Sequence, residues 1–148
     1  MNQNEVAIVK KRNNAKIPYR ATTGSAGLDL CAAIDESIII APGDLVSIPS
    51  GIAIALPNEN YVALIFARSG LGVKYGITLS NGVGVIDSDY RGEIFVGLCN
   101  LSKEPYEIIP GERIAQLIFF PLANLNLLPK DNLDPTDRNE KRFGSTGK

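Results

Sequence analysis

Short apolar segments, separated by turn residues, constrain the fold of this chain more than any other feature. Many of the segments are rich in isoleucine and valine, and stretches such as APGD (41–44) and IPGE (109–112) lie between them. No window holds a helical period over about 12 residues, and the best helix candidate is one or two turns that begin at Ser69. The predicted strands are 6–9, 37–40, 45–48, 52–56, 61–66, 93–99, 107–109 and 114–120.

This pattern predicts an all-β domain, built as a sandwich, a jelly roll or a small barrel. The chain has 148 residues, of which 45% are hydrophobic, so it is long enough for one domain with a real core.

The last 20 residues differ from the rest in composition. They carry nine charges and only two large apolar side chains, Leu133 and Phe143. Such a segment cannot bury enough surface to offset its ordering entropy. We therefore expect a folded β domain over 1–128 and a mobile C-terminal arm over 129–148, in which FGSTG (143–147) orders on a ligand.

The charge balance and the cysteine content limit which binding partners and which cellular compartment can be expected for this chain. The 15 basic and 16 acidic residues nearly cancel, which gives no argument for nucleic acid or membrane binding. We see no signal peptide and no apolar stretch of about 18 residues. Cys31 and Cys99 lie far apart and form no CxxC pair. We therefore expect two small buried thiols in a cytoplasmic protein, or in a nuclear or organellar one if the source is eukaryotic.

The chain contains no histidine. This absence excludes a Ser-His-Asp triad, a Cys-His pair and histidine metal sites. If the chain is an enzyme, its proton acceptor is expected to be a carboxylate, and any metal is expected to be hard and bound through oxygen, with magnesium the first candidate.

Three stretches carry polar residues next to predicted strands. ARSGLG (67–72) could bind an anion through backbone amides, a hydroxyl and a guanidinium, although an arginine beside a turn is more often simply solvated. Asp29 in AGLDL could cap a turn or hold a hydrated magnesium ion. Arg113 and Gln116 in GERIAQLI (111–118) are, taken alone, better explained by an amphipathic edge strand.

The stretch NGVGVIDSDYRGE (81–93) combines several features of a binding site. Residues 81–84 predict a tight turn or hairpin whose backbone could present hydrogen-bonding groups to a base edge. Asp87 follows the apolar Ile86, where loss of water would raise its basicity. Tyr90 offers a flat ring for a sugar. Asp89, Arg91 and Glu93 are better explained as structural or intersubunit charges.

Together, five stretches resemble the motifs of the trimeric dUTPase family, in order: AGLDL, ARSGLG, NGVGVIDSDYRGE, GERIAQLI and RFGSTG (142–147). The resemblance covers the chain from about residue 17 to residue 147. It implies a β jelly roll that assembles into a homotrimer with three active sites at the subunit junctions. It also implies hydrolysis of dUTP to dUMP and pyrophosphate, a reaction that keeps uracil out of DNA and supplies dUMP for thymidylate synthesis.

The same resemblance implies a role for each residue. Asp87 would activate the water that attacks the α-phosphate, and Asp29 would bind Mg²⁺ through water. Asn81 and the backbone at Gly84 and Val85 would read uracil, while Tyr90 would pack on the deoxyribose and exclude a 2′-hydroxyl. The implied phosphate contacts are Arg68, Ser69, Gly70, Arg113 and Gln116. The implied contacts from the arm are Arg138, Phe143, which would stack on uracil, Gly144, Ser145 and Thr146.

The arm departs from the family pattern at three positions, and two alternative functions remain open. Where the family arm has three further glycines, this chain has Asn139, Lys141 and Arg142; a positive φ at those positions would strain a lysine or an arginine. A dCTP deaminase, or its bifunctional relative, shares the fold and would need a glutamate such as Glu93 for acid-base work. The second alternative is a nucleotide-binding regulator without turnover.

Overall fold

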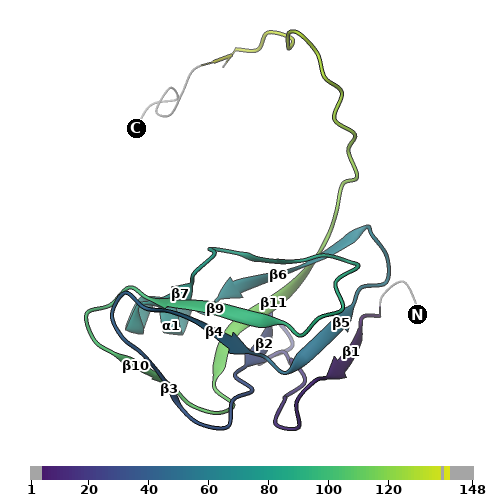
Figure 1. The fold of residues 1–148 in the computed structure, drawn as a ribbon. Helices are drawn as coiled ribbons and strands as arrows, with labels where there is room; N and C mark the ends of the chain where they lie inside the picture. Colours follow the sequence, from purple (N-terminus) through teal and green to yellow (C-terminus); the bar gives the residue numbers. More distant parts are fainter. Residues whose placement is uncertain (1–4, 138, 141–148) are drawn as a thin grey trace.

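The computed structural model describes residues 5–137, 139 and 140. Within these residues, short antiparallel strands form four small sheets around one core, with one short helix at the side (Figure 1). The elements are β1 (Ala7–Lys10), β2 (Leu28–Cys31), β3 (Ile38–Ile40), β4 (Leu45–Pro49), β5 (Ile52–Ala55), β6 (Tyr61–Ala67), α1 (Ser69–Tyr75), β7 (Ile77–Leu79), β8 (Gly84–Ile86), β9 (Phe95–Asn100), β10 (Tyr106–Ile108) and β11 (Arg113–Pro121).

The largest sheet has the order β2-β11-β6-β8, and a second sheet has the order β4-β9-β7. Two pairs, β1-β5 and β3-β10, complete the described body. Every pairing is antiparallel, and most neighbouring strands are distant in sequence. This is an all-β jelly-roll architecture: the sequence pattern predicted an all-β domain, and the family resemblance implied the jelly roll.

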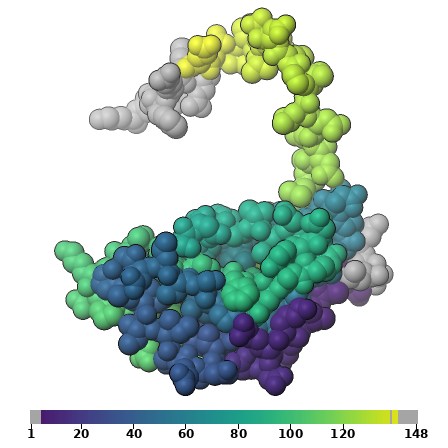
Figure 2. All heavy atoms as spheres, in the orientation of Figure 1, coloured from purple at the N-terminus to yellow at the C-terminus, as the bar shows by residue number. Residues whose placement is uncertain are grey.

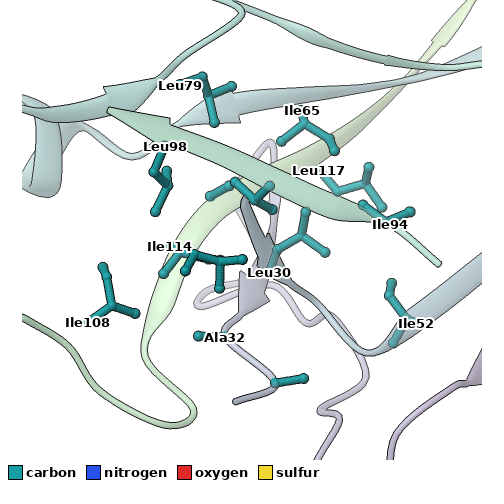
Figure 3. Packing of buried hydrophobic residues seen from close by; sticks show 14 of the residues in the cluster. Leu30, Ala32, Ile52, Ile65, Leu79, Ile94, Leu98, Ile108, Ile114 and Leu117 are labelled. Atoms are coloured by element: carbon teal, nitrogen blue, oxygen red, sulfur yellow. The ribbon is translucent and has the colours of Figure 1, made fainter. Parts of the chain in front are cut away.

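The core lies between the two larger sheets. Leu30 from β2, Ile65 from β6, Leu98 from β9 and Leu117 from β11 converge there (Figure 3), and each is at most 3% exposed. Burial of apolar area at about 25 cal/mol per Å² makes this cluster the main source of stability. It also fixes the β2-β11-β6 region rigidly beneath the polar residues described below.

All eight predicted strands and the predicted helix are present, with bounds shifted by one or two residues at some ends. Three short strands, β2, β7 and β8, were not predicted. The turn at Asn81 is confirmed by the hydrogen bond from Val83 N to its carbonyl oxygen at 2.9 Å. A hairpin at this place is wrong: β7 pairs with β9 and β8 pairs with β6, so the turn carries the chain from one sheet to another.

After β11 the chain leaves the body (Figures 1 and 2). The segment 122–137 contains no helix or strand, and all of its residues are exposed. Asn60 holds the start of this segment, because its backbone oxygen accepts from Leu122 N at 2.7 Å and its side-chain oxygen accepts from Asn124 at 2.7 Å. The departure thus begins before residue 129, the arm boundary that composition indicated.

Candidate active site

Three adjacent strands gather the polar residues of the first, second and fourth motifs. In the register of the sheet, Gln116 on β11 faces Asp29 on β2 and Phe66 on β6, and Arg68 follows directly after β6. A register shift between Arg113 and Ala115 interrupts the alternation of β11. With strict alternation, Arg113 and Gln116 would point to opposite faces of the sheet. Two consecutive buried residues lie between them, and both polar side chains therefore face away from the core.

Asp29 joins Arg68 and Arg113 in a compact ionic group. We call these three residues, together with Gln116, the cradle. Nε of Arg68 donates to Oδ1 of Asp29 at 3.0 Å, and Nη1 of Arg113 donates to Oδ2 at 3.0 Å. Arg68 also donates to the backbone oxygen of Arg113 at 3.1 Å. Asp29 is only 9% exposed, and its hydrogen bond to Arg113 raises the pKa of that guanidinium. The group carries one more positive than negative charge, which suits it to an anion.

The cradle borders a cavity of about 260 Å³. Helix α1 begins at this cavity with Arg68 as its N-cap, and no side chain caps its first amides. Backbone amides of this kind bind phosphate oxygens readily. The residues lining the cavity are Ala21, Ser25, Ala26, Gly27, Asp29, Arg68, Ser69, Gly70, Arg113 and Gln116.

Gly27 and Arg20 shape this cavity, although no sequence pattern predicted a role for either of them. A Cβ atom at Gly27 would lie 2.7 Å from Oε1 and 3.0 Å from Cβ of Gln116. Glycine is thus needed for Gln116 to keep its position, in which Nε2 donates to the Ala67 oxygen at 3.0 Å. Arg20 donates to the backbone oxygens of Ser25 and Ala26 and holds the cavity wall. An arginine without periodic context gives no sequence signal for such a role.

A larger cavity of about 510 Å³ shares Arg68 and Arg113 with the cradle. Tyr106, on its wall, donates its hydroxyl to Oε1 of Glu112 at 2.6 Å. Burial, followed by this hydrogen bond, raises the pKa of Tyr106 well above its ordinary value. The tyrosine therefore stays neutral and ties β10 to the turn before β11.

The third motif borders a different cavity, of about 210 Å³. Its lining is Val85, Ile86, Asp87, Tyr90, Glu93, Ile94 and Phe95, and it shares no residue with the cavity at the cradle. Asp87 is exposed within this chain, so its position next to the apolar Ile86 does not shield it from water. Ile86 is the last residue of the short strand β8, and Asp87 follows where that strand ends. Asn81 is also exposed, at the turn before β8.

The loop that carries Asp87 is tightly folded. Tyr90 N donates to the backbone oxygen of Asp87 at 3.2 Å. The Arg91 side chain donates to the backbone oxygens of Ser88 at 2.7 Å and Tyr90 at 2.9 Å. The Glu93 carboxylate is held by Arg12, with a distance of 2.6 Å from Nε to Oε1. This carboxylate is thus engaged in an ion pair and is not free for the acid-base work that a deaminase would require.

All five predicted arm contacts lie outside the described residues, as do Lys141 and Arg142: Arg138, Phe143, Gly144, Ser145 and Thr146. Asn139 is described and has a φ of 40°. One of the three replaced glycine positions therefore has a positive φ, and it carries asparagine, which tolerates this conformation better than most residues. Asn139 and Thr136 exchange two hydrogen bonds, of 2.9 and 3.0 Å, that fix the turn.

The carboxylate oxygens of the described residues can be compared with the oxygen ligands that Mg²⁺ prefers. Within the described part of the chain, no three His, Cys, Asp or Glu side chains are grouped to hold a metal. Both Asp29 oxygens already accept a hydrogen bond from an arginine, and each oxygen keeps one further acceptor site. The carboxylate can therefore accept from metal-bound water, whereas direct coordination would compete with two arginines.

No described helix is long and apolar enough to cross a membrane.

Comparison with known proteins identifies the family. The dUTPase family model matches residues 13–147. The deoxyuridine 5′-triphosphate nucleotidohydrolase of Desulfitobacterium hafniense is 50% identical over 97% of this chain and 95% of its own length. The solved structure of the Staphylococcus bacteriophage 80alpha dUTPase with dUPNHPP is 28% identical, has a TM-score of 0.86 and covers 97% of this chain and 99% of that one.

A mutant dUTPase from phage phi11 of S. aureus, described with a structural Mg(II) ion, has a TM-score of 0.80. It is 23% identical over 89% of this chain and 100% of its own, and at that identity it supports the fold alone. The comparisons confirm the function predicted from the motifs and support neither the deaminase nor the regulator. The match over nearly the whole length shows that the chain belongs to the dUTPase family.

Proposed function

We propose that this chain hydrolyses dUTP at sites that different subunits of a homotrimer complete together. The activity itself follows from family membership: the chain is a dUTP diphosphatase, which releases dUMP and pyrophosphate. One observation carries the proposal of shared sites. The cradle and the Asp87 loop are each fully formed, yet they line separate cavities of one chain. A second copy of the chain can bring the Asp87 loop of one subunit to the cradle of another.

In this proposal the cradle binds the triphosphate. Arg68 and Arg113 supply guanidinium donors, Ser69 and Gly70 supply the first turn of α1, and Gln116 offers its remaining amide hydrogen. Because Asp29 already fixes both arginines, these donors need little reorganisation when charge develops on the phosphates. Preorganised donors of this kind supply much of the rate enhancement in phosphoryl transfer.

Asp87 acts as the general base. It takes a proton from water as the water oxygen attacks the α-phosphorus; the bond from that phosphorus to the bridging oxygen breaks, and pyrophosphate leaves. The exposed carboxylate, which accepts no hydrogen bond from any other described side chain, is open to a water molecule. Apposition of a second subunit would remove bulk water around Asp87 and increase its basicity.

Asn81 and the backbone at Gly84 and Val85 recognise uracil in this proposal. Cytosine reverses a donor and an acceptor on the same edge, so a backbone that fits uracil leaves its own groups unpaired against cytosine. Tyr90 packs against the deoxyribose and leaves no space for a 2′-hydroxyl.

Mg²⁺, held chiefly by the triphosphate and through water by Asp29, would neutralise charge on the leaving pyrophosphate. The arm beyond residue 129 would close over the site, with Phe143 on the uracil and Arg138, Gly144, Ser145 and Thr146 at the phosphates. We place the enzyme in the cytoplasm because both cysteines are buried free thiols, as a reducing compartment favours. There it would keep uracil out of DNA and supply dUMP for thymidylate synthesis.

The substrate is tested by pyrophosphate release from dUTP, dCTP, dTTP and UTP in parallel, with magnesium. We expect turnover of dUTP far above the other three. Ammonia release from dCTP would contradict the proposal.

Site sharing is tested by mixing two inactive variants, Asp87→Asn and Arg68→Ala, under conditions that exchange subunits. If each site takes Asp87 from one subunit and Arg68 from another, random trimers should regain about 25% of the sites. A site built within one chain would recover nothing. The native mass of each variant and of the mixture serves as the control for assembly.

A further inference from the structure

Arg12 lies 81 residues before Glu93 in the sequence, yet it contacts the loop that carries Asp87 and Tyr90. It forms a two-pronged ion pair with Glu93, with Nε 2.6 Å from Oε1 and Nη2 3.2 Å from Oε2. Gly51 N donates to the same Oε1 at 3.1 Å. The Glu93 side chain is 17% exposed, so the pair is shielded from water on the glutamate side. A paired arginine of this kind fixes both the position and the orientation of a carboxylate.

The residue after Glu93 is fixed to the turn between β4 and β5. The Ile94 oxygen accepts from Ser50 N at 3.0 Å and from Ser50 Oγ at 2.6 Å, and Ile94 N donates to the Ile52 oxygen at 2.8 Å. At the other end of the loop, β8 pairs with β6. The loop is therefore held at both ends. The Arg12–Glu93 ion pair adds a further attachment at its C-terminal end, which we call the clamped end.

Tyr90 rests on this clamped end. Its hydroxyl donates to the backbone oxygen of Glu93 at 2.9 Å. Its ring lies over Gly92, where a Cβ atom would come within 2.3 Å of the hydroxyl and 2.5 Å of Cζ. Only glycine leaves space for the ring. The position of the ring thus depends on the backbone of Glu93, whose side chain Arg12 and Gly51 hold.

We infer that Arg12 is a positioning residue for sugar selection: through Glu93 it holds the Tyr90 ring where it excludes a 2′-hydroxyl. This inference rests on the proposed function, in which Tyr90 contacts the deoxyribose. A ribose fits only if the ring shifts, so rejection of UTP depends on how firmly the ring is held. Arg12 does not touch substrate and contributes nothing to proton transfer at Asp87.

The test measures kcat and KM for dUTP and for UTP in the assembled enzyme, with Arg12→Gln, Glu93→Gln and the double variant. Arg12→Lys retains the positive charge but cannot donate to both Glu93 oxygens in the planar, two-pronged geometry of a guanidinium. Lys10→Gln, at an exposed position two residues away, removes the same charge without touching Glu93 and is the matched control. Thermal melting and native mass confirm that each variant is folded and assembled.

We expect the ratio of kcat/KM for dUTP to that for UTP to fall about tenfold in Arg12→Gln and in Glu93→Gln. The double variant should fall no further, because both residues act through one contact. Arg12→Lys should lie between these variants and the parent, and Lys10→Gln should equal the parent. The kcat for dUTP should change by less than about twofold in all of them.

Unchanged selectivity in Arg12→Gln, with dUTP still hydrolysed, would overturn this inference and leave the proposed function intact. Equal losses of kcat for both nucleotides would do the same, since they would indicate a general structural role. If Arg12→Gln does not fold, unchanged selectivity in Arg12→Lys would overturn it. A parent chain without dUTP turnover would overturn the proposed function and this inference with it.

Discussion

The cradle and the Asp87 loop are two halves of one proposed site, and they are built in opposite ways. In the cradle, a carboxylate that is only 9% exposed is bound by two arginines over a rigid three-strand platform. In the loop, the carboxylate of Asp87 is exposed, and only backbone and neighbouring side chains hold its position. In the proposed site, the comparison teaches that the binding half forms within one subunit, whereas the reactive half takes its surroundings from a second subunit.

The largest effect should come from the loop. Asp87→Asn removes the proposed base and should lower kcat about 10²–10⁴-fold, with little change in stability, because no other described side chain depends on this carboxylate. Pyrophosphate release and urea unfolding measure the two quantities. Asp89→Asn, at an exposed position in the same loop, is the control and should retain activity. Comparable activity in both variants would remove Asp87 from its role.

The cradle should respond in stability as well as activity. Asp29→Asn leaves Arg68 and Arg113 without their charged partner and should lower the free energy of unfolding by about 1–3 kcal/mol. Urea unfolding at one fixed protein concentration measures it. Asp44→Asn, an exposed carboxylate, should change it by less than about 0.5 kcal/mol. If Asp29→Asn were as stable as Asp44→Asn, the contrast between the two halves would fail.

The contrast between these halves also shows how far the sequence allowed prediction. Long apolar runs such as those of β6 and β11 were located within one residue at each end. The ion pairs of Asp29 were not predictable, because its partners lie 39 and 84 residues away, and an isolated aspartate equally fits a turn cap or a metal ligand. Likewise, a hairpin after Asn81 was a natural expectation, because local sequence does not record that β8 pairs with β6.

A smaller effect should follow from the close approach of Gly27 to Gln116. Gly27→Ala would push the Gln116 side chain from its hydrogen bond to the Ala67 oxygen and should raise KM for dUTP about tenfold. Steady-state kinetics measures it. Gly24→Ala, where a Cβ atom meets nothing within 4 Å, is the matched control. Equal KM values for the two variants would show that Gln116 can move without consequence.

The smallest effect concerns alkaline pH at the edge of the cradle. Burial and Glu112 raise the pKa of Tyr106, so the folded chain keeps this proton where the unfolded chain loses it. The contribution to stability is full below the unfolded value, about 10, and is lost as pH rises through the folded value. Tyr106→Phe should therefore lose stability less steeply than the parent above pH ~10, as urea midpoints across pH would measure. Parallel curves would contradict this.

The register shift in β11 has an evolutionary consequence. Because one extra residue lets Arg113 and Gln116 face the same side, this half of the site depends on the length of the strand as well as on its residues. Point substitutions can be tolerated or repaired one at a time, whereas a single deletion between Arg113 and Gln116 would turn one of them toward the core. Natural variants of this strand should therefore differ in residue identity far more readily than in length.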